Sequence, residues 1–179
     1  FLDKWNNVWV SLNNGLARIE IYSAFSYFST VNGVKGGLSD ICRFNNKVYI
    51  ATTQGLRYLD KTNFQKQAIH GNMFKLIKDL QADCNKMLAT PYGLLISTDN
   101  GLYFLDKKDK VETINKNHIF EDFLSIDSSF KKILVCLNNG IGIIEFTNGK
   151  PKFSPLKSDF FDHIRTIAKD ADGSYWTGS

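Results

Sequence analysis

A short motif that recurs along the chain is the feature that most restricts its fold. Each copy starts with a pair of large apolar residues, continues with a small residue, and ends in a tight-turn sequence with glycine. The glycines are Gly15, Gly55, Gly101 and Gly140, so the interval is about forty residues. The copies occupy residues 9–16, 49–56, 95–102 and 134–141, and a fifth opens at 176–179.

The residue types in this motif predict a β-hairpin. Asn, Asp and Gly tolerate positive φ, so the turn sequence suits a tight reversal, and the Leu or Ile after the glycine starts the returning strand. The small third residue lets a neighbouring element pack closely. Because Cys136 takes this position, we predict a packing role for it, and we interpret Cys42 and Cys84 as packed thiols too. The third residues are Ser11, Ala51, Ser97, Cys136 and Gly178.

Segments on both sides of the motif complete a four-stranded unit. An inner strand precedes it, as at 39–42, 124–126 and 164–167, and a polar outer strand follows, as at 65–70 and 111–114. Units of four strands with this period are typical of propeller blades. We therefore predict an all-β fold, a β-propeller fragment of about four four-stranded antiparallel blades. The predicted repeats span roughly 1–30, 38–70, 76–115 and 123–156, with the start of a fifth at 163–179.

The blade prediction can be tested at one ambiguous segment and at ten expected core residues. The periodicity of residues 75–84 also fits a helical turn, but the flanking repeats require an inner strand nearby, so we predict a strand. The core is expected at the strand positions of the repeat. Its predicted members include Trp9, Ile41, Tyr49, Ile50, Leu95, Ile96, Ile126, Leu134, Val135 and Ile167.

Composition argues against several classes of function. The net charge of +4 arises from 22 basic and 18 acidic residues that are scattered along the chain, so no nucleic-acid partner is expected. No apolar run has the length of a membrane span, and we expect no direct membrane contact in this segment. The chain contains no nucleophile elbow, Walker loop or His-Glu-x-x-His motif. We therefore predict no enzymatic activity and no cofactor for this segment.

Two stretches resemble a known family. Residues 167–178 read Ile-x-x-Asp-x-Asp-Gly-x-x-Trp-x-Gly, and residues 13–18 read Asn-Asn-Gly-Leu-x-Arg. Both resemble the two-component regulator propeller repeat of bacterial sensor proteins, although copies two to four lack the Trp and the fourth has Ile141 in place of Leu. The resemblance implies a periplasmic propeller in a membrane protein whose histidine kinase or DNA-binding output lies outside these 179 residues. In many members the signal is a polysaccharide fragment.

The resemblance implies a sensing role and a set of partners. We expect a ligand-sensing extracytoplasmic segment that binds an oligosaccharide or another small ligand. The alternatives are a propeller hydrolase or lyase with a channel-centred metal, and an interaction scaffold without a small ligand. Family members have more than four blades per ring, so we expect an open arc. Its exposed edges, around Trp9 and Trp176, would contact remaining blades or another copy of the chain.

The predicted ligand site lies in the connections between blades. These connections share a face with the glycine turns, and they contain all three histidines together with several acids. Such residues could bind a polar ligand, coordinate a metal, or be solvated loop residues. We assign no metal site. The candidate ligand-binding residues are His70, His118, Glu121, Asp122, Asp162 and His163.

Overall fold

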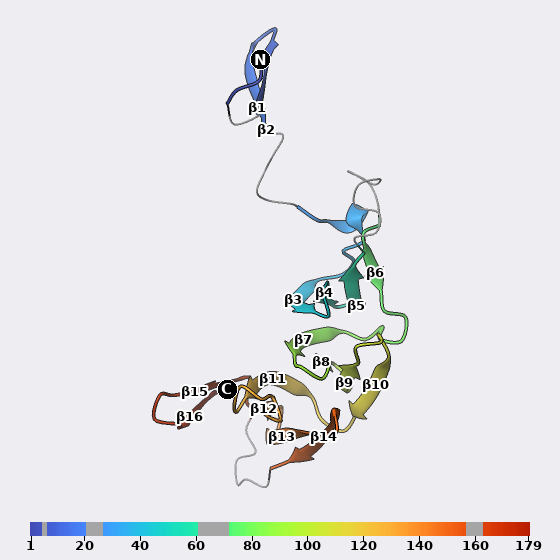
Figure 1. Ribbon diagram of the computed structural model, residues 1–179, viewed down its shortest axis with the longest axis vertical. Coiled ribbons are helices and arrows are strands. Elements are labelled where there is room, and N and C mark those ends of the chain that lie inside the picture. Colours follow the sequence, from blue (N-terminus) through green and yellow to red (C-terminus); the bar gives the residue numbers. More distant parts are fainter. Residues whose placement is uncertain (5–6, 21–26, 61–71, 157–162) are drawn as a thin grey trace.

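The computed structural model describes residues 1–4, 7–20, 27–60, 72–156 and 163–179. Within these ranges the chain is all-β, apart from one 3-10 turn at Thr30–Asn32, and its strands form five antiparallel sheets (Figure 1). Three sheets have four strands and two have two strands. No helix in the described part has the length and hydrophobicity needed to cross a lipid bilayer.

Each four-stranded sheet is a meander in which consecutive strands are hydrogen-bonded. The first contains β3 (Leu38–Phe44), β4 (Lys47–Thr52), β5 (Gly55–Leu59) and β6 (Phe74–Leu76). The second contains β7 (Cys84–Ala89), β8 (Leu94–Thr98), β9 (Gly101–Leu105) and β10 (Val111–Asn115). The third contains β11 (Phe120–Ser125), β12 (Lys132–Leu137), β13 (Gly140–Thr147) and β14 (Lys150–Pro155). The two hairpins are β1 (Asn7–Leu12) with β2 (Gly15–Glu20), and β15 (Thr166–Lys169) with β16 (Tyr175–Gly178).

The sheets are arranged as blades. The first strands, β3, β7, β11 and β15, contact one another in series, so they form the inner edge of the arrangement. The later strands of each sheet lie progressively farther out, and the sheets follow one another along an open curve (Figure 1). The predicted fold class, an all-β propeller fragment, is confirmed.

The core is divided into layers between successive blades. In the four-stranded blades the first residue of the motif faces the following blade: Tyr49 packs with residues of β7–β9, and Leu95 packs with residues of β11–β13. The second residue faces the preceding blade, as Ile96 and Val135 do. This alternation follows from the pleat of a strand, which sends successive side chains to opposite faces. The motif of each four-stranded blade therefore contributes to the core layers on both of its faces.

The prediction for residues 75–84 is wrong. β6 ends at Leu76 and β7 begins at Cys84, so the segment between them is a turn and not an inner strand. Ile77 and Leu80 are buried against the core, and backbone hydrogen bonds join both to Leu56. The apolar residues of this segment therefore pack over the turn at Gly55. The predicted outer strand at 65–70 lies outside the described residues.

Six of the ten predicted core residues are buried: Tyr49, Ile50, Leu95, Ile96, Val135 and Ile167. Trp9, Ile126 and Leu134 are partly exposed. The prediction for Ile41 is wrong, because this side chain is 63% exposed. Ile41 lies on the inner strand of the first four-stranded blade, on the face that the preceding blade would cover. Cys84 and Cys136 are buried and Cys42 is partly buried, and all three are free thiols.

A polar cluster on the opposite side from the glycine turns joins the first two four-stranded blades. Asp109, in the turn between β9 and β10, accepts hydrogen bonds from Lys47 Nζ and, at 2.9 Å, from Tyr49 Oη. Partial burial favours the neutral carboxyl group, but the bonds from Lys47 and Tyr49 outweigh it and hold the pKa of Asp109 below its ordinary value of 3.8. The cluster therefore stabilises the fold when Asp109 is ionised.

Replacing Asp109 by asparagine is expected to lower the free energy of unfolding at pH 7 by roughly 1 kcal/mol. The expected loss of unfolding free energy is modest, because Lys47 and Asp109 are about one-third exposed and solvent screens their charges. A depressed folded-state pKa contributes stability above the ordinary carboxyl pKa, and this contribution is lost as the pH falls through the folded-state value. Urea unfolding at pH 7 and near pH 3 should therefore show a smaller difference between wild type and variant at the lower pH.

The matched control for this test is Glu112→Gln, which removes a carboxylate that pairs with Lys110 on the outer strand of the same blade. This exposed pair should contribute little at either pH. An Asp109→Asn effect that is no larger than the control effect would contradict the role assigned to the cluster.

Candidate functional site

Four polar residues occupy the same position on the four consecutive inner strands. Asp40 on β3, Lys86 on β7, Asp122 on β11 and Thr166 on β15 lie opposite the small third residue of the motif in their own blades. Their partners are Ala51, Ser97, Cys136 and Gly178. We call these four polar residues the inner-strand row.

A β-bulge precedes three members of the row. The pairing register shifts between Leu38 and Asp40, between Cys84 and Lys86, and between Phe120 and Asp122. Each shift leaves one residue without a partner on the second strand, and bulges of this kind re-aim side chains and often adjoin binding sites. The extra residues are Ser39, Asn85 and Glu121. Arg165 stands in the corresponding place before Thr166 and is exposed.

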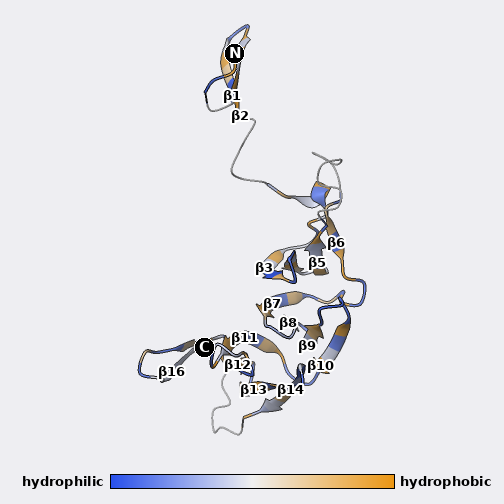
Figure 2. Ribbon diagram, viewed as in Figure 1, coloured by the Kyte–Doolittle hydropathy of each residue, from blue (hydrophilic) through white to orange (hydrophobic). Residues whose placement is uncertain are grey.

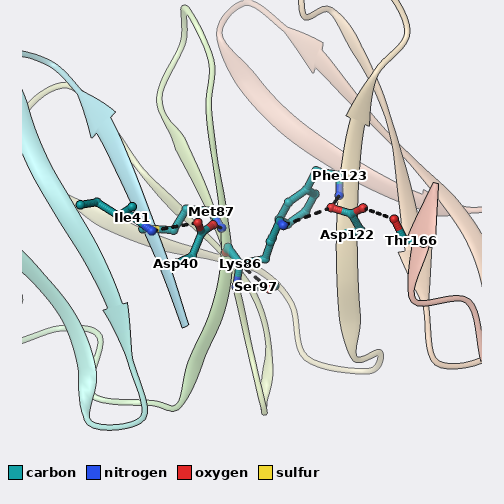
Figure 3. A network of polar contacts seen from close by, with 8 residues as sticks. All are labelled: Asp40, Ile41, Lys86, Met87, Ser97, Asp122, Phe123 and Thr166. Atoms are coloured by element: carbon teal, nitrogen blue, oxygen red, sulfur yellow. Dashed lines mark hydrogen bonds and ion pairs between the residues drawn. The ribbon is translucent and has the colours of Figure 1, made fainter. Parts of the chain in front are cut away.

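The row is connected from strand to strand (Figure 3). Asp40 Oδ2 accepts a hydrogen bond of 2.8 Å from the amide of Met87 on the next inner strand. Lys86 Nζ lies 3.9 Å from Asp122 Oδ1, and Thr166 Oγ1 donates to Asp122 Oδ2 at 3.1 Å. Asp122 thus stands between a cation on one neighbouring blade and a hydroxyl on the other.

Glu121 and His163 extend the row toward the glycine-turn face. His163 Nε2 lies 2.8 Å from Glu121 Oε1, which links the bulge of β11 to the connection that leads into β15. Both side chains retain exposed surface. Because Asp122 adjoins Glu121 and Thr166 follows His163 closely, carboxylate, imidazole and hydroxyl groups gather at the junction of β11 and β15.

The structure divides the six predicted site residues. Glu121, Asp122 and His163 come together at this junction. His118 has different partners: its Nδ1 is 3.3 Å from Asn139 Oδ1, and its ring packs edge-on against Phe153 and Phe120. No direct contact joins it to Glu121, Asp122 or His163 among the contacts of the described residues. His70 and Asp162 lie outside the described residues.

The thiol of Cys136 is buried beneath the junction. Burial raises the pKa of Cys136 to about 12, and the nearby charges of Asp122 and Glu121 act in the same direction. The thiolate, which is the nucleophile and the metal ligand, is therefore scarce at neutral pH. Within the described ranges, no three His, Cys, Asp or Glu residues are grouped as metal ligands would be. The arrangement suits hydrogen bonding to a polar molecule.

Asp40, Lys86 and Thr166 were missed by the sequence reasoning, which concentrated on the connections. A signal for them was present. Each immediately precedes an apolar residue of the inner strand, as Asp122 precedes Phe123, so the same polar–apolar pair recurs in every blade. Aligning the inner strands, as well as the motifs, would have identified the row.

No protein-family model matches the chain, and no curated protein matches it. Among solved structures, it is similar to the extracellular domain of a protein assigned as a hybrid two-component system of B. thetaiotaomicron, with a TM-score of 0.63 and 18% identity over 100% of this chain and 25% of that one. A second similar structure is the extracellular domain of a protein assigned as a one-component system of the same organism. Its TM-score is 0.59 and its identity 17%, over 98% of this chain and 24% of that one.

A luciferin-regenerating enzyme is also similar, with a TM-score of 0.57 and 15% identity over 80% of this chain and 56% of that one. At such identities these similarities establish the fold alone. The chain spans about a quarter of the length of the two bacterial extracellular domains.

Proposed function

We propose that this chain is a ligand-sensing, extracytoplasmic propeller segment of a bacterial signalling protein of the two-component type. The observation that carries the proposal is the similarity, over the whole chain, to the extracellular domain of a hybrid two-component system. A second extracellular signalling domain of similar structure supports the same role. The kinase or DNA-binding output belongs, in this proposal, to other parts of the protein.

The proposed ligand is an oligosaccharide, and its site is the inner-strand row with Glu121 and His163. Carboxylates, a lysine and a hydroxyl alternate along the row, so donors and acceptors are presented together. Sugar hydroxyls both donate and accept, and they match such a surface better than a ligand of one charge would. The chemistry of the row therefore favours a molecule with several hydroxyl groups.

The same contacts supply a route for the signal. The row joins consecutive blades through Asp40, Lys86, Asp122 and Thr166. A ligand that replaces the Lys86–Asp122 or Asp122–Thr166 contact would alter how neighbouring blades are held together. It shifts the conformational equilibrium of the blades if it binds one arrangement of them more tightly than another.

Glycan-array binding followed by calorimetry tests the proposal. For a glycan that binds, Glu121→Gln and Lys86→Gln are each expected to weaken binding by roughly tenfold or more, since a hydrogen bond to a charged group contributes about 1.5–3 kcal/mol. Glu112→Gln on β10 and Lys110→Gln directly before it are the controls, because they change the same charges away from the row. Equal losses in both pairs would contradict the assigned site, and failure of every glycan to bind would contradict the ligand class.

A propeller hydrolase or lyase is the second candidate, and the similarity to a luciferin-regenerating enzyme favours it. Elemental analysis of the purified chain distinguishes the two functions. One divalent ion per chain, lost in Glu121→Gln, would support the enzyme and overturn the sensor assignment. Glycan binding without a metal would support the sensor and also exclude a scaffold that lacks a small ligand.

A further inference from the structure

Asparagine is followed directly by glycine at five places in the chain. This dipeptide is chemically labile, because glycine has no Cβ to hinder the approach of its amide nitrogen to the side-chain carbonyl of the asparagine. The local sequence chemistry is the same at all five places, so any difference in reactivity in the folded chain comes from the structure. The five asparagines are Asn14, Asn32, Asn100, Asn139 and Asn148.

The glycine is held in place in four of the five pairs. Gly15, Gly101 and Gly140 are the first residues of β2, β9 and β13, and each is paired with the last residue of the strand before it. These three glycines therefore belong to the strand ladder and not to the turn itself. In the fourth pair the amide of Gly33 donates to Thr30 O at 3.1 Å, and Asn32 is only 8% exposed.

Two of these pairs also hold the asparagine side chain. Asn100 Oδ1 accepts a hydrogen bond of 2.9 Å from Tyr103 Oη, and Asn139 Oδ1 lies 3.3 Å from His118 Nδ1. Either side chain must give up its contact before it can rotate toward the following amide nitrogen. These contacts therefore protect Asn100 and Asn139 in the folded chain.

The fifth pair, Asn148 and Gly149, forms the whole turn between β13 and β14, since Thr147 pairs with Lys150. The φ angles of 51° and 77° are those of a type I′ turn. Gly149 thus lies outside the ladder, and its amide donates no hydrogen bond within the part of the chain that the structure describes. Asn148 is exposed in a hydrophilic turn (Figure 2), and its side chain makes no polar contact with the described residues.

We propose that Asn148 is a site of spontaneous deamidation through a succinimide. The amide nitrogen of Gly149 bonds to Cγ of Asn148, and the side-chain amino group leaves as ammonia with the proton that the Gly149 nitrogen loses. Water then opens the ring. Cleavage of the bond from Cγ to the Gly149 nitrogen gives aspartate, and cleavage of the bond from the backbone carbonyl carbon gives isoaspartate. The reaction needs only water and the chain itself.

The modified turn borders a contact between the second and third four-stranded blades. A Cβ built on Gly149 would lie 4.0 Å from Cδ1 of Tyr92, whose ring stacks on Phe146 with the centroids 4.7 Å apart. Isoaspartate lengthens the main chain inside a two-residue turn, so it displaces Gly149 and loosens this contact. Because β13 begins at a glycine turn and ends at this one, the site lies at the far end of the blade. The proposal is independent of the proposed function.

Peptide mapping by mass spectrometry, after the purified chain has been kept in mildly alkaline buffer, compares the five pairs in one sample. In the folded chain Asn148 is expected to convert about tenfold faster than Asn32, Asn100 and Asn139, which react only after local opening. Asn14 is exposed next to a ladder glycine and should rank second. In concentrated urea the five pairs should convert at similar rates, because the structure that separates them is gone.

A rate at Asn148 in the folded chain no higher than the rates at Asn100 and Asn139 would overturn the proposal. The variant control is Asn148→Gln, whose longer side chain closes the ring slowly. It should abolish conversion at this position and leave the other four rates unchanged. The converted chain, separated by ion exchange, is expected to unfold at a lower temperature than the parent. An unchanged unfolding temperature would overturn the effect assigned to the blade contact.

Discussion

Replacing Leu95 by alanine is expected to lower the free energy of unfolding by about 2–5 kcal/mol. Leu95 lies in β8 and is 0% exposed, within the layer between the second and third four-stranded blades. Its neighbours, among them Phe104, Phe120 and Val135, come from both blades, so removing the side chain leaves a cavity that neither blade can close alone. Urea unfolding followed by circular dichroism measures the loss.

Leu134→Ala is the matched comparison. Leu134 is the corresponding residue of the next motif copy, but it is only partly buried, against the β15–β16 hairpin. Its truncation should cost less than that of Leu95. A loss below about 1 kcal/mol at Leu95 would count against the blade register, because truncation of a fully buried leucine costs more than that.

Replacing Gly101 by valine is expected to be at least as damaging as the Leu95 change. Gly101 has a φ of 133°, and a Cβ built on it would lie 2.2 Å from the backbone oxygen of Asn115. The positive φ costs a valine about 1–3 kcal/mol in backbone strain. The contact between the Cβ and the Asn115 oxygen forces the end of β10 to move, since a backbone oxygen cannot rotate away as a flexible side chain can.

Gly15→Val separates the two effects. Gly15 ends the first motif copy with a φ of 143°, but a Cβ there would meet nothing within 4 Å. Only the backbone strain should remain, so thermal unfolding should show a clearly smaller loss for Gly15→Val than for Gly101→Val. Equal losses would mean that the close approach of Asn115 to the turn does not matter.

The repeat predicted the fold well because it encodes local geometry and packing together. The glycine turns define each hairpin, and the alternation of large residues around them defines two layers of core. It failed at residues 75–84, where apolar residues such as Ile77 and Leu80 pack over a turn and imitate a strand. It also failed at Ile41, since a repeat position is buried only where a neighbour covers it.

The candidate site was only partly predictable. The connections pointed to Glu121 and His163, which contact each other, and to His118, whose ring packs against Phe153. Asp40, Lys86 and Thr166 were missed because their proximity depends on the stacking of inner strands, and the bulges before Asp40 and Lys86 re-aim those two residues. Neither feature is visible in one repeat taken alone.

Recognition of a ligand on the inner-strand row can be mapped by nuclear magnetic resonance of the ¹⁵N-labelled chain, titrated with a glycan that binds on the array. We expect amide shift changes to concentrate at Met87, Asp122, Phe123 and Thr166, whose amides or side chains take part in the row. Shift changes confined to the outer strands β10 and β14 would contradict it.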